Sequence, residues 1–268
     1  KRLFVWGTSL SIFLLALIFG STLANQWETV LSFINGIQFN TNEPVFQKDI
    51  SFYVFTLPFL RMIQQWLLGV IITTIAIAIS IHVITLVLSG VNFRQAITPK
   101  MLKQSSVLVG FMLLVVALGY WLKTYELLFS SNGAIFGAAY TDLNARLPAF
   151  RLLTLIVSFS GIFVLSNYYF RSSRIILISV GICITSAVTI GVIYPSIVQR
   201  FQVNPNELHV ERDYIPRNIE FTRKGFALDR IIEEDYDLAT IETGDMAGEL
   251  APLNAETISA NPGTMNNV

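Results

Sequence analysis

The sequence predicts an all-α, polytopic membrane protein with about five transmembrane helices and an extracytoplasmic C-terminal segment. Two observations predict this class. First, 53% of the 268 residues are hydrophobic and 13% are charged, whereas soluble domains carry about 25% charged residues. Second, charged residues are missing from long blocks, a pattern typical of segments that cross a bilayer.

Five runs without Asp, Glu, Lys or Arg are the predicted spans, at about residues 3–24, 64–90, 105–122, 152–170 and 175–198. Crossing a hydrocarbon core of about 30 Å at about 1.5 Å per residue takes roughly 20 helical residues. Lipid offers no hydrogen-bond partners, so each run must satisfy its own backbone polar groups as a helix. The run 105–122 is the shortest of the five.

Aromatic residues near the ends of these runs support the boundaries. The four tryptophans are Trp6, Trp27, Trp66 and Trp121. Amphipathic rings prefer the headgroup layer, so such placement is expected of spanning helices. The alternative is chance clustering in a chain that is rich in aromatic residues.

The distribution of charge predicts the orientation. With five spans, alternate connections lie on opposite sides of the membrane. One side then contains no acidic residue and seven basic ones: Lys1, Arg2, Arg94, Lys100, Lys103, Arg171 and Arg174. All 18 acidic residues fall on the other side. Short loops rich in Lys and Arg stay in the cytoplasm, so we expect a multi-pass cell-membrane protein whose tail after residue 198 faces outward.

The two outward connections are longer than simple turns. In the first, Trp27, Val30, Leu31 and Ile34 have the spacing of a short amphipathic helix that lies on the membrane surface. Residues 42–46 are turn-like. The apolar stretch 50–55 follows, with Pro58 near the entry to the second span.

We divide the chain into a transmembrane block, 1–198, an extracytoplasmic helical segment, 199–238, and a linker or truncated start of an outer domain, 239–268. A helix is expected from Pro216 to about Glu233, apolar on two faces and therefore covered on two sides. Residues 239–268 are low in aromatic residues and show no period. Because the chain starts at Lys1 without Met, we expect a fragment of a longer protein.

Two spans carry small residues at steps of four, which let another helix approach closely. In the fifth span these are Ser179, Cys183, Ala187 and Gly191. In the first span they are Ala16, Gly20 and Ala24. The grooves predict either contact with a partner helix or ordinary packing within the chain.

Three residues are candidates for a polar or interaction site. His82 is an ionisable side chain inside a predicted span, where such groups are often functional; the alternative is a neutral histidine bonded to a neighbouring Ser or Thr. Asp142 and Arg146 are four residues apart in the second outward connection. They could bind a ligand or form a local ion pair.

Motifs of known chemistry are missing from the sequence. It has no Gly-rich phosphate loop, no nucleophile elbow and no His-Glu-x-x-His motif. We therefore predict no catalytic residues, no cofactor and no metal site. Its tail is acidic, which argues against nucleic acid as a partner. The expected partners are membrane lipids and a helix or envelope protein.

Several stretches resemble uncharacterised protein family 0182, large multi-pass membrane proteins of bacteria. They are residues 42–55 (NEPVFQKDISFYVF), 137–142 (GAAYTD), 145–149 (ARLPA) and 198–208 (VQRFQVNPNEL), followed by Glu211, Tyr214, Ile215, Asn218, Ile219, Thr222 and Arg223. Family members often have Asp-Pro where this chain has Glu43-Pro44. The resemblance implies that the intact protein continues into a large extracytoplasmic domain, and it implies no activity or catalytic residues.

We therefore expect a membrane anchor or scaffold that presents an extracytoplasmic domain. The alternative is a transporter or channel subunit. That alternative would need polar groups near the midplane of the bilayer, or helices broken by Gly and Pro. Pro195, at the end of the fifth predicted span, would not supply such a break.

Overall fold

The structure is a computed structural model that describes residues 2–89, 98–130, 137–212, 214–226, 228 and 231. Within these ranges every regular element is a helix, apart from an isolated bridge between Asn42 and Asp49. The chain divides into two units, Lys1–Phe221 and Thr222–Val268. The long helices all belong to the first unit. The predicted segment 239–268 and the basic residue Arg94 lie outside the described residues.

Four helices are long and apolar enough to cross a membrane: Phe52–Val87, Pro99–Phe129, Asp142–Phe170 and Ser173–Asn206. They correspond to the second to fifth predicted spans and confirm the all-α membrane fold class. Helix α1 (Arg2–Ala24) occupies the first predicted span, but its apolar part within the described side chains is the shorter Ile12–Ala24. The total of five crossings therefore stays a prediction.

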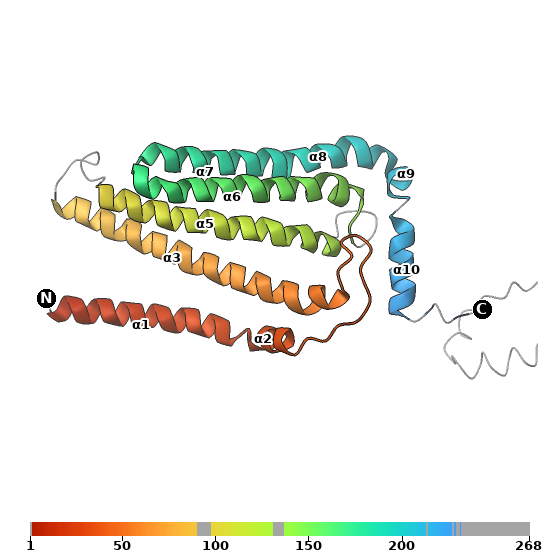
Figure 1. Ribbon diagram of the computed structural model, residues 1–268, viewed down its shortest axis with the longest axis horizontal. Helices are drawn as coiled ribbons and strands as arrows, with labels where there is room; N and C mark the ends of the chain where they lie inside the picture. The colour runs from red at the N-terminus through yellow and green to blue at the C-terminus, as the bar shows by residue number, and fades with distance from the viewer. Residues whose placement is uncertain are drawn as a thin grey trace, which may run out of the picture. The chain divides into compact units, whose positions relative to one another are not determined.

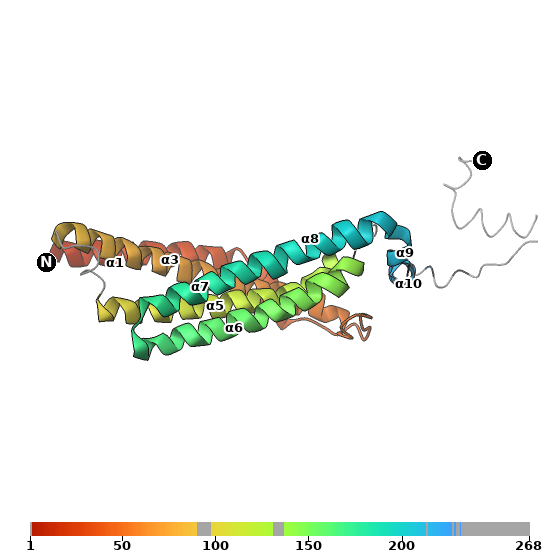
Figure 2. The same ribbon diagram turned by 90° about the horizontal axis from the view of Figure 1, so that it is seen from above.

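The long helices lie side by side and alternate in direction (Figures 1 and 2). In chain order after α1 they are α3 (Leu57–Ser89), α5 (Pro99–Glu126), α6 (Leu147–Phe170) and α7 (Ser173–Val188). The start of α1, the end of α3, the start of α5 and the α6–α7 turn share one end of the unit. We call this the turn end. The short helices α2 (Trp27–Ile34) and α9 (Glu207–Glu211) lie at the other end, which we call the loop end.

The core of the unit lies between α5, α6 and α7. Its buried side chains include Leu113 and Ala117 of α5, Val157 and Val164 of α6, and Cys183 of α7. Ser179 is also buried, so the small residues of the fifth span pack within the chain. In the first span, a Cβ added at Gly20 would meet no atom of the described residues within 4 Å, so no neighbouring helix packs on the groove at that position.

The apolar side chains on the outside of the unit suit lipid. Phe159 of α6, Leu177 of α7 and Val87 of α3 are 70%, 71% and 73% exposed. Water would penalise such a surface by about 25 cal/mol for each Å², whereas lipid tails are as apolar as these side chains. Burial of small residues inside and exposure of large apolar residues outside is therefore consistent with membrane insertion.

The spanning helices extend beyond the uncharged runs. The second begins at Phe52 and not at Gln64, and the third runs from Pro99, much longer than the predicted 105–122. Charged residues lie within both extensions. Arg61 forms an ion pair with Glu126, with 3.0 Å between Arg61 Nε and Glu126 Oε1. Residues that form a charge pair near the membrane boundary can stay helical. The length of an uncharged run therefore underestimates the length of the helix.

Each of four π-helical turns ends two residues before a proline. The turns are η1 (Phe52–Thr56), η3 (Asp142–Arg146), η4 (Thr189–Ile193) and η5 (Gln199–Val203), and the prolines are Pro58, Pro148, Pro195 and Pro205. Proline has no N–H and its ring clashes with the carbonyl of the preceding turn. A wider π turn relieves this clash without ending the helix. The expectation that Pro195 marks a helix end was therefore wrong, because the helical run continues to Asn206.

A buried asparagine shapes the turn between α6 and α7. Asn167 Nδ2 donates to Ser106 Oγ and to the Ser172 carbonyl, both at 2.9 Å, and Asn167 Oδ1 accepts from the Ser172 N–H at 2.9 Å. Arg171 takes a left-handed conformation, with φ of 55°. These bonds satisfy groups that the end of a helix leaves without partners. They also join the turn to α5.

The loop end agrees in part with prediction. Helix α2 confirms the short helix expected from Trp27, and a turn occupies residues 44–46. The tail helix α10 (Ile215–Gly225) begins where expected but ends before Phe226. Gly225 has poor helix propensity, which explains the earlier end. Leu228 therefore lies beyond α10. Ile232 and Glu233, at the expected end of this helix, lie outside the described residues.

Candidate functional site

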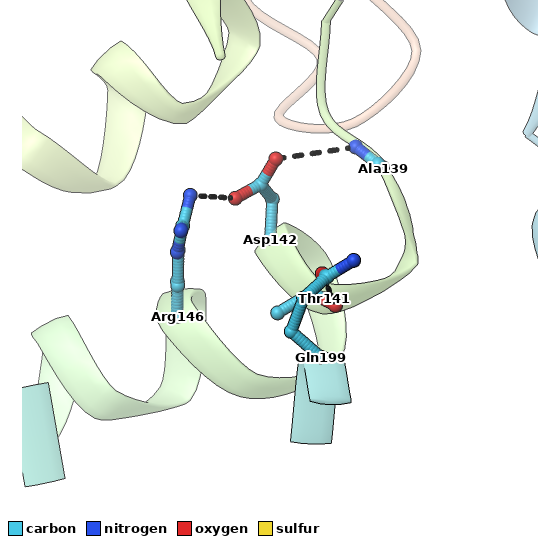
Figure 3. A network of polar contacts seen from close by, with 5 residues as sticks. All are labelled: Ala139, Thr141, Asp142, Arg146 and Gln199. Carbon is cyan, nitrogen blue, oxygen red and sulfur yellow. Dashed lines mark hydrogen bonds and ion pairs between the residues drawn. The ribbon is translucent and has the colours of Figure 1, made fainter. Parts of the chain in front are cut away.

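Asp142 is a buried carboxylate at the start of the helical run that contains α6. Its side chain is 2% exposed, and Oδ1 accepts a hydrogen bond from Arg146 Nη1 at 2.8 Å (Figure 3). The other oxygen, Oδ2, accepts from the Ala139 N–H at 3.4 Å. A buried carboxylate is costly unless it is paired and hydrogen-bonded. The predicted pairing of Asp142 with Arg146 is thus present as an i,i+4 ion pair.

The residue before Asp142 connects this loop to the last spanning helix. The Thr141 hydroxyl donates to Gln199 Oε1, and Gln199 Nε2 donates to Asn204 Oδ1 at 3.0 Å. Thr141 is 3% exposed. Gln199 begins η5, which is the first turn after the predicted fifth span. The bond therefore fixes the start of the tail against the second outward connection.

Two further hydrogen bonds connect the same loop to the tail. Gln202 Nε2 donates to Tyr140 Oη at 3.0 Å, and Asn144 Nδ2 donates to Tyr214 Oη at 2.9 Å. The rings of Tyr140 and Tyr214 meet edge to face, with centroids 6.1 Å apart. Residues 199–214 are therefore attached to residues 140–146 at three places. We call the set the loop–tail junction: Tyr140, Thr141, Asp142, Asn144, Arg146, Gln199, Gln202 and Tyr214.

The junction has the properties of a structural joint. Hydroxyl and amide groups bond to one another across the two segments, and the Asp142 carboxylate is paired with Arg146. Within the part of the chain that the structure describes, no group of three His, Cys, Asp or Glu side chains could hold a metal ion. Its bonds hold two segments of the chain together.

A second polar cluster organises the first outward connection. Glu43 is 8% exposed, and its carboxylate accepts from the N–H groups of Val45 and Phe46 and, at 3.2 Å, from the Tyr53 hydroxyl. Asp49 accepts from the N–H groups of Phe39, Thr41 and Ser51. The two carboxylates thus supply acceptors for a loop that has no regular structure of its own.

Bonding of Asp49 to Ser51 has an electrostatic consequence. Hydrogen bonds from the hydroxyl and then the N–H of Ser51 lower the pKa of Asp49 from 3.8 to about 2. These bonds favour the ionised carboxylate. Asp49 therefore keeps its charge, and its acceptor role, at any ordinary pH.

His82 lies apart from both clusters. It is half-buried near the end of α3, at the turn end, whereas the loop–tail junction is at the loop end. Among the described residues no hydrogen bond or ion pair of the His82 side chain is present. The structure thus brings Asp142 and Arg146 together and leaves His82 elsewhere. A role for any of the three in function stays a prediction.

Sequence reasoning missed Gln199, Gln202, Asn144 and Tyr214 as members of the site. A signal for the first two was present, because polar Gln199 and Gln202 directly follow an apolar span. Nothing in the spacing identifies Asn144 or Tyr214 as their neighbours. These residues are brought together by the return of the last helix to the loop end, which is a tertiary feature.

Comparison with known proteins gives one consistent result. The profile of a family described as "Uncharacterised protein family (UPF0182)" matches residues 2–268. Proteins named UPF0182 protein from Thermobifida fusca, Desulforamulus reducens and Trichodesmium erythraeum are 40%, 31% and 31% identical to the chain, over 96%, 95% and 96% of it. The chain spans only 25%, 26% and 27% of these relatives. No solved structure matches the chain significantly.

Proposed function

The chain belongs to the uncharacterised protein family UPF0182, and we propose that it is the membrane anchor of a scaffold that presents an extracytoplasmic segment. The chain is an integral membrane protein of unknown activity, and it covers about a quarter of its relatives' length. The single observation that carries the proposal is the loop–tail junction. It fixes the end of the last spanning helical run and Tyr214 beyond it, which suits an anchor for a following domain.

The contacts of the junction support a rigid connection. A flexible tether would need none of the bonds from residues 140–146 to residues 199–214. Instead, the buried Thr141 bonds to Gln199 at the base of the tail, and Val203, in the same turn as Gln199, is fully buried. Ordering a tail costs about 1–2 kcal/mol per residue in backbone entropy. A junction that offsets this cost indicates that the direction of the tail matters.

The proposal is tested in a bacterium that carries the full-length protein. We expect a version that ends after Val198 to insert into the membrane and to lose the function of the whole protein, measured as envelope integrity in a detergent-sensitivity assay. Retention of full function by the spanning helices alone would exclude the anchor role.

A finer test addresses the junction itself. The double variant Asn144→Ala and Gln199→Leu removes two links to the tail, and we expect faster protease cleavage within residues 199–214 in proteoliposomes. Ser196→Ala is the matched control, because the Ser196 hydroxyl donates only to the Val192 carbonyl of its own helix. Equal cleavage rates in wild type and the double variant would show that the junction does not hold the tail.

A further inference from the structure

A cleft of about 310 Å³ lies between α3 and α5 near the loop end, outside the loop–tail junction. Arg61, Gln65, Tyr120 and Lys123 line its polar end, and Leu68 and Val116 line its apolar end. Leu68 follows Arg61 by seven residues on α3, and Val116 precedes Lys123 by seven on α5. At about 1.5 Å per residue, the cleft changes from charged to apolar over about 10 Å.

The polar end carries a surplus of positive charge. The Arg61 guanidinium is paired with Glu126 and also donates to Gln64 Oε1 at 3.3 Å. Lys123 is exposed and forms no ion pair with a carboxylate of the described chain. Its Nζ instead lies 5.6 Å from the centre of the Tyr120 ring. One positive charge is therefore left for an anion, and the fixed guanidinium offers further N–H donors beside it.

The position of the cleft along the helices suits the headgroup layer. Trp121, two residues before Lys123, is 39% exposed on α5, and tryptophan prefers the membrane–water interface. A ligand there meets water at the lysine and hydrocarbon at Val116. Phospholipids have this arrangement of charge and chain. A soluble anion would use the polar end alone and leave the apolar end unexplained.

We propose that this cleft binds an anionic phospholipid, with the phosphate at Lys123 and Arg61 and an acyl chain along Leu68 and Val116. The larger cleft on the other side of Arg61, of about 500 Å³, is lined at its polar end by Arg61 and the uncharged Thr22, Gln26 and Gln65. It has no second cation. The smaller cleft, which is lined by two cationic side chains, therefore favours a negatively charged ligand more than the larger cleft does.

The test uses the purified chain in nanodiscs and fluorescent phosphatidylglycerol as the probe, with phosphatidylcholine as the background lipid. We expect Lys123→Gln to weaken probe binding about tenfold, the loss of one charged hydrogen bond. Lys48→Gln is the matched control, since Lys48 also lies over aromatic rings, with its Nζ 4.6 Å from the Phe52 ring centre, but does not line the cleft. Equal weakening by both variants would mean general attraction to the surface and would overturn the proposal.

Two further measurements locate the ligand. Gly119 lines the cleft, and a Cβ there would lie 2.9 Å from Gln64 Nε2, so Gly119→Ala narrows the cleft without changing its charge. We expect this variant to weaken binding as well, and unchanged binding would place the lipid elsewhere. Inorganic phosphate should fail to displace the probe. Full displacement would identify a soluble anion as the ligand and overturn the lipid assignment.

Discussion

At the scale of single residues, the loop end is stabilised by acidic side chains that accept hydrogen bonds from the backbone. Glu43 and Asp49 each serve several N–H groups within one loop. An irregular segment has no ladder of its own, so its N–H groups need such acceptors. Glu43 and Asp49 therefore stabilise the local structure of this loop.

Replacing Glu43 by alanine tests its role in the first outward connection. We expect Glu43→Ala to lower the free energy of unfolding by about 1–3 kcal/mol, because two N–H groups and the Tyr53 hydroxyl lose their acceptor. Thermal unfolding of the purified chain in detergent measures this change. Glu28→Ala is the control, since Glu28 is exposed on α2, and a similar loss in both variants would contradict the role of Glu43.

Low pH should destabilise the same loop, because it protonates Asp49. Its pKa falls from 3.8 to about 2 on folding, so its stabilising effect is fully present above pH 3.8 and is lost as pH falls through about 2. We expect the N–H groups of Phe39, Thr41 and Ser51 to exchange with solvent faster over that range, after correction for intrinsic rates. In the variant Asp49→Asn these three N–H groups should exchange quickly at every pH. If the variant kept the protection of the wild type, the Asp49 carboxylate would not be the cause of that protection.

At the scale of helices, α5 and α6 approach each other closely at Gly110 and Gly161. A Cβ added at Gly110 would lie 2.6 Å from the Leu165 side chain and 3.2 Å from the Gly161 carbonyl oxygen. Without water to drive helices together, close packing at small residues is a main source of association in lipid. This pair was not singled out in the sequence, because the two glycines lie in different spans and neither belongs to a series of three small residues at steps of four.

Enlarging one of these glycines tests the contact. Gly110→Val should lower the free energy of unfolding by about 1–3 kcal/mol, the usual cost of overpacking. Gly181→Val adds the same side chain on α7, where a Cβ meets nothing within 4 Å, and should leave stability nearly unchanged. Reversible unfolding in mixed micelles measures both. If Gly110→Val behaved like Gly181→Val, the helices would not be in close contact there.

The sequence predicted the helices well and their ends poorly, for a physical reason. Apolar length determines where a chain can cross lipid, so the four longest helices coincide with predicted spans. The sequence places Pro58 near the entry to the second span and Pro195 at the end of the fifth, yet both lie within continuous helical runs that widen before them. The ion pair between Arg61 and Glu126 likewise allows α3 and α5 to continue past charged residues.

At the scale of the whole molecule, the candidate site was predictable only in its local part. The spacing of Asp142 and Arg146 is enough to expect their ion pair, since residues four apart meet on a helix. The bonds from Thr141 and Asn144 to the tail depend on how the last helix returns to the loop end. The local pattern of a single sequence does not contain that information.

Orientation is the prediction that connects the structure with the anchor proposal. Basic residues without acidic neighbours gather at the turn end, where Lys100 and Lys103 open α5 and Arg171 lies in the α6–α7 turn. Among the described residues of the first unit, Glu28, Glu43, Asp49, Glu126 and Asp142 lie at the loop end. By the preference of Lys and Arg for the cytoplasmic side, we expect the turn end to face the cytoplasm and the start of the tail to face outward.

Variants with a single introduced cysteine measure this orientation directly. Cys183 is the only cysteine and is buried, so Cys183→Ala gives a thiol-free background into which Asn40→Cys, Arg171→Cys or Arg212→Cys is placed singly. In intact cells a membrane-impermeant maleimide should label the variants at 40 and 212, and should label the variant at 171 only after lysis. Lysed cells, in which all three should react, provide the control for access. Labelling at 171 together with protection at 40 and 212 would mean the opposite orientation, and the tail could not then present a domain to the exterior.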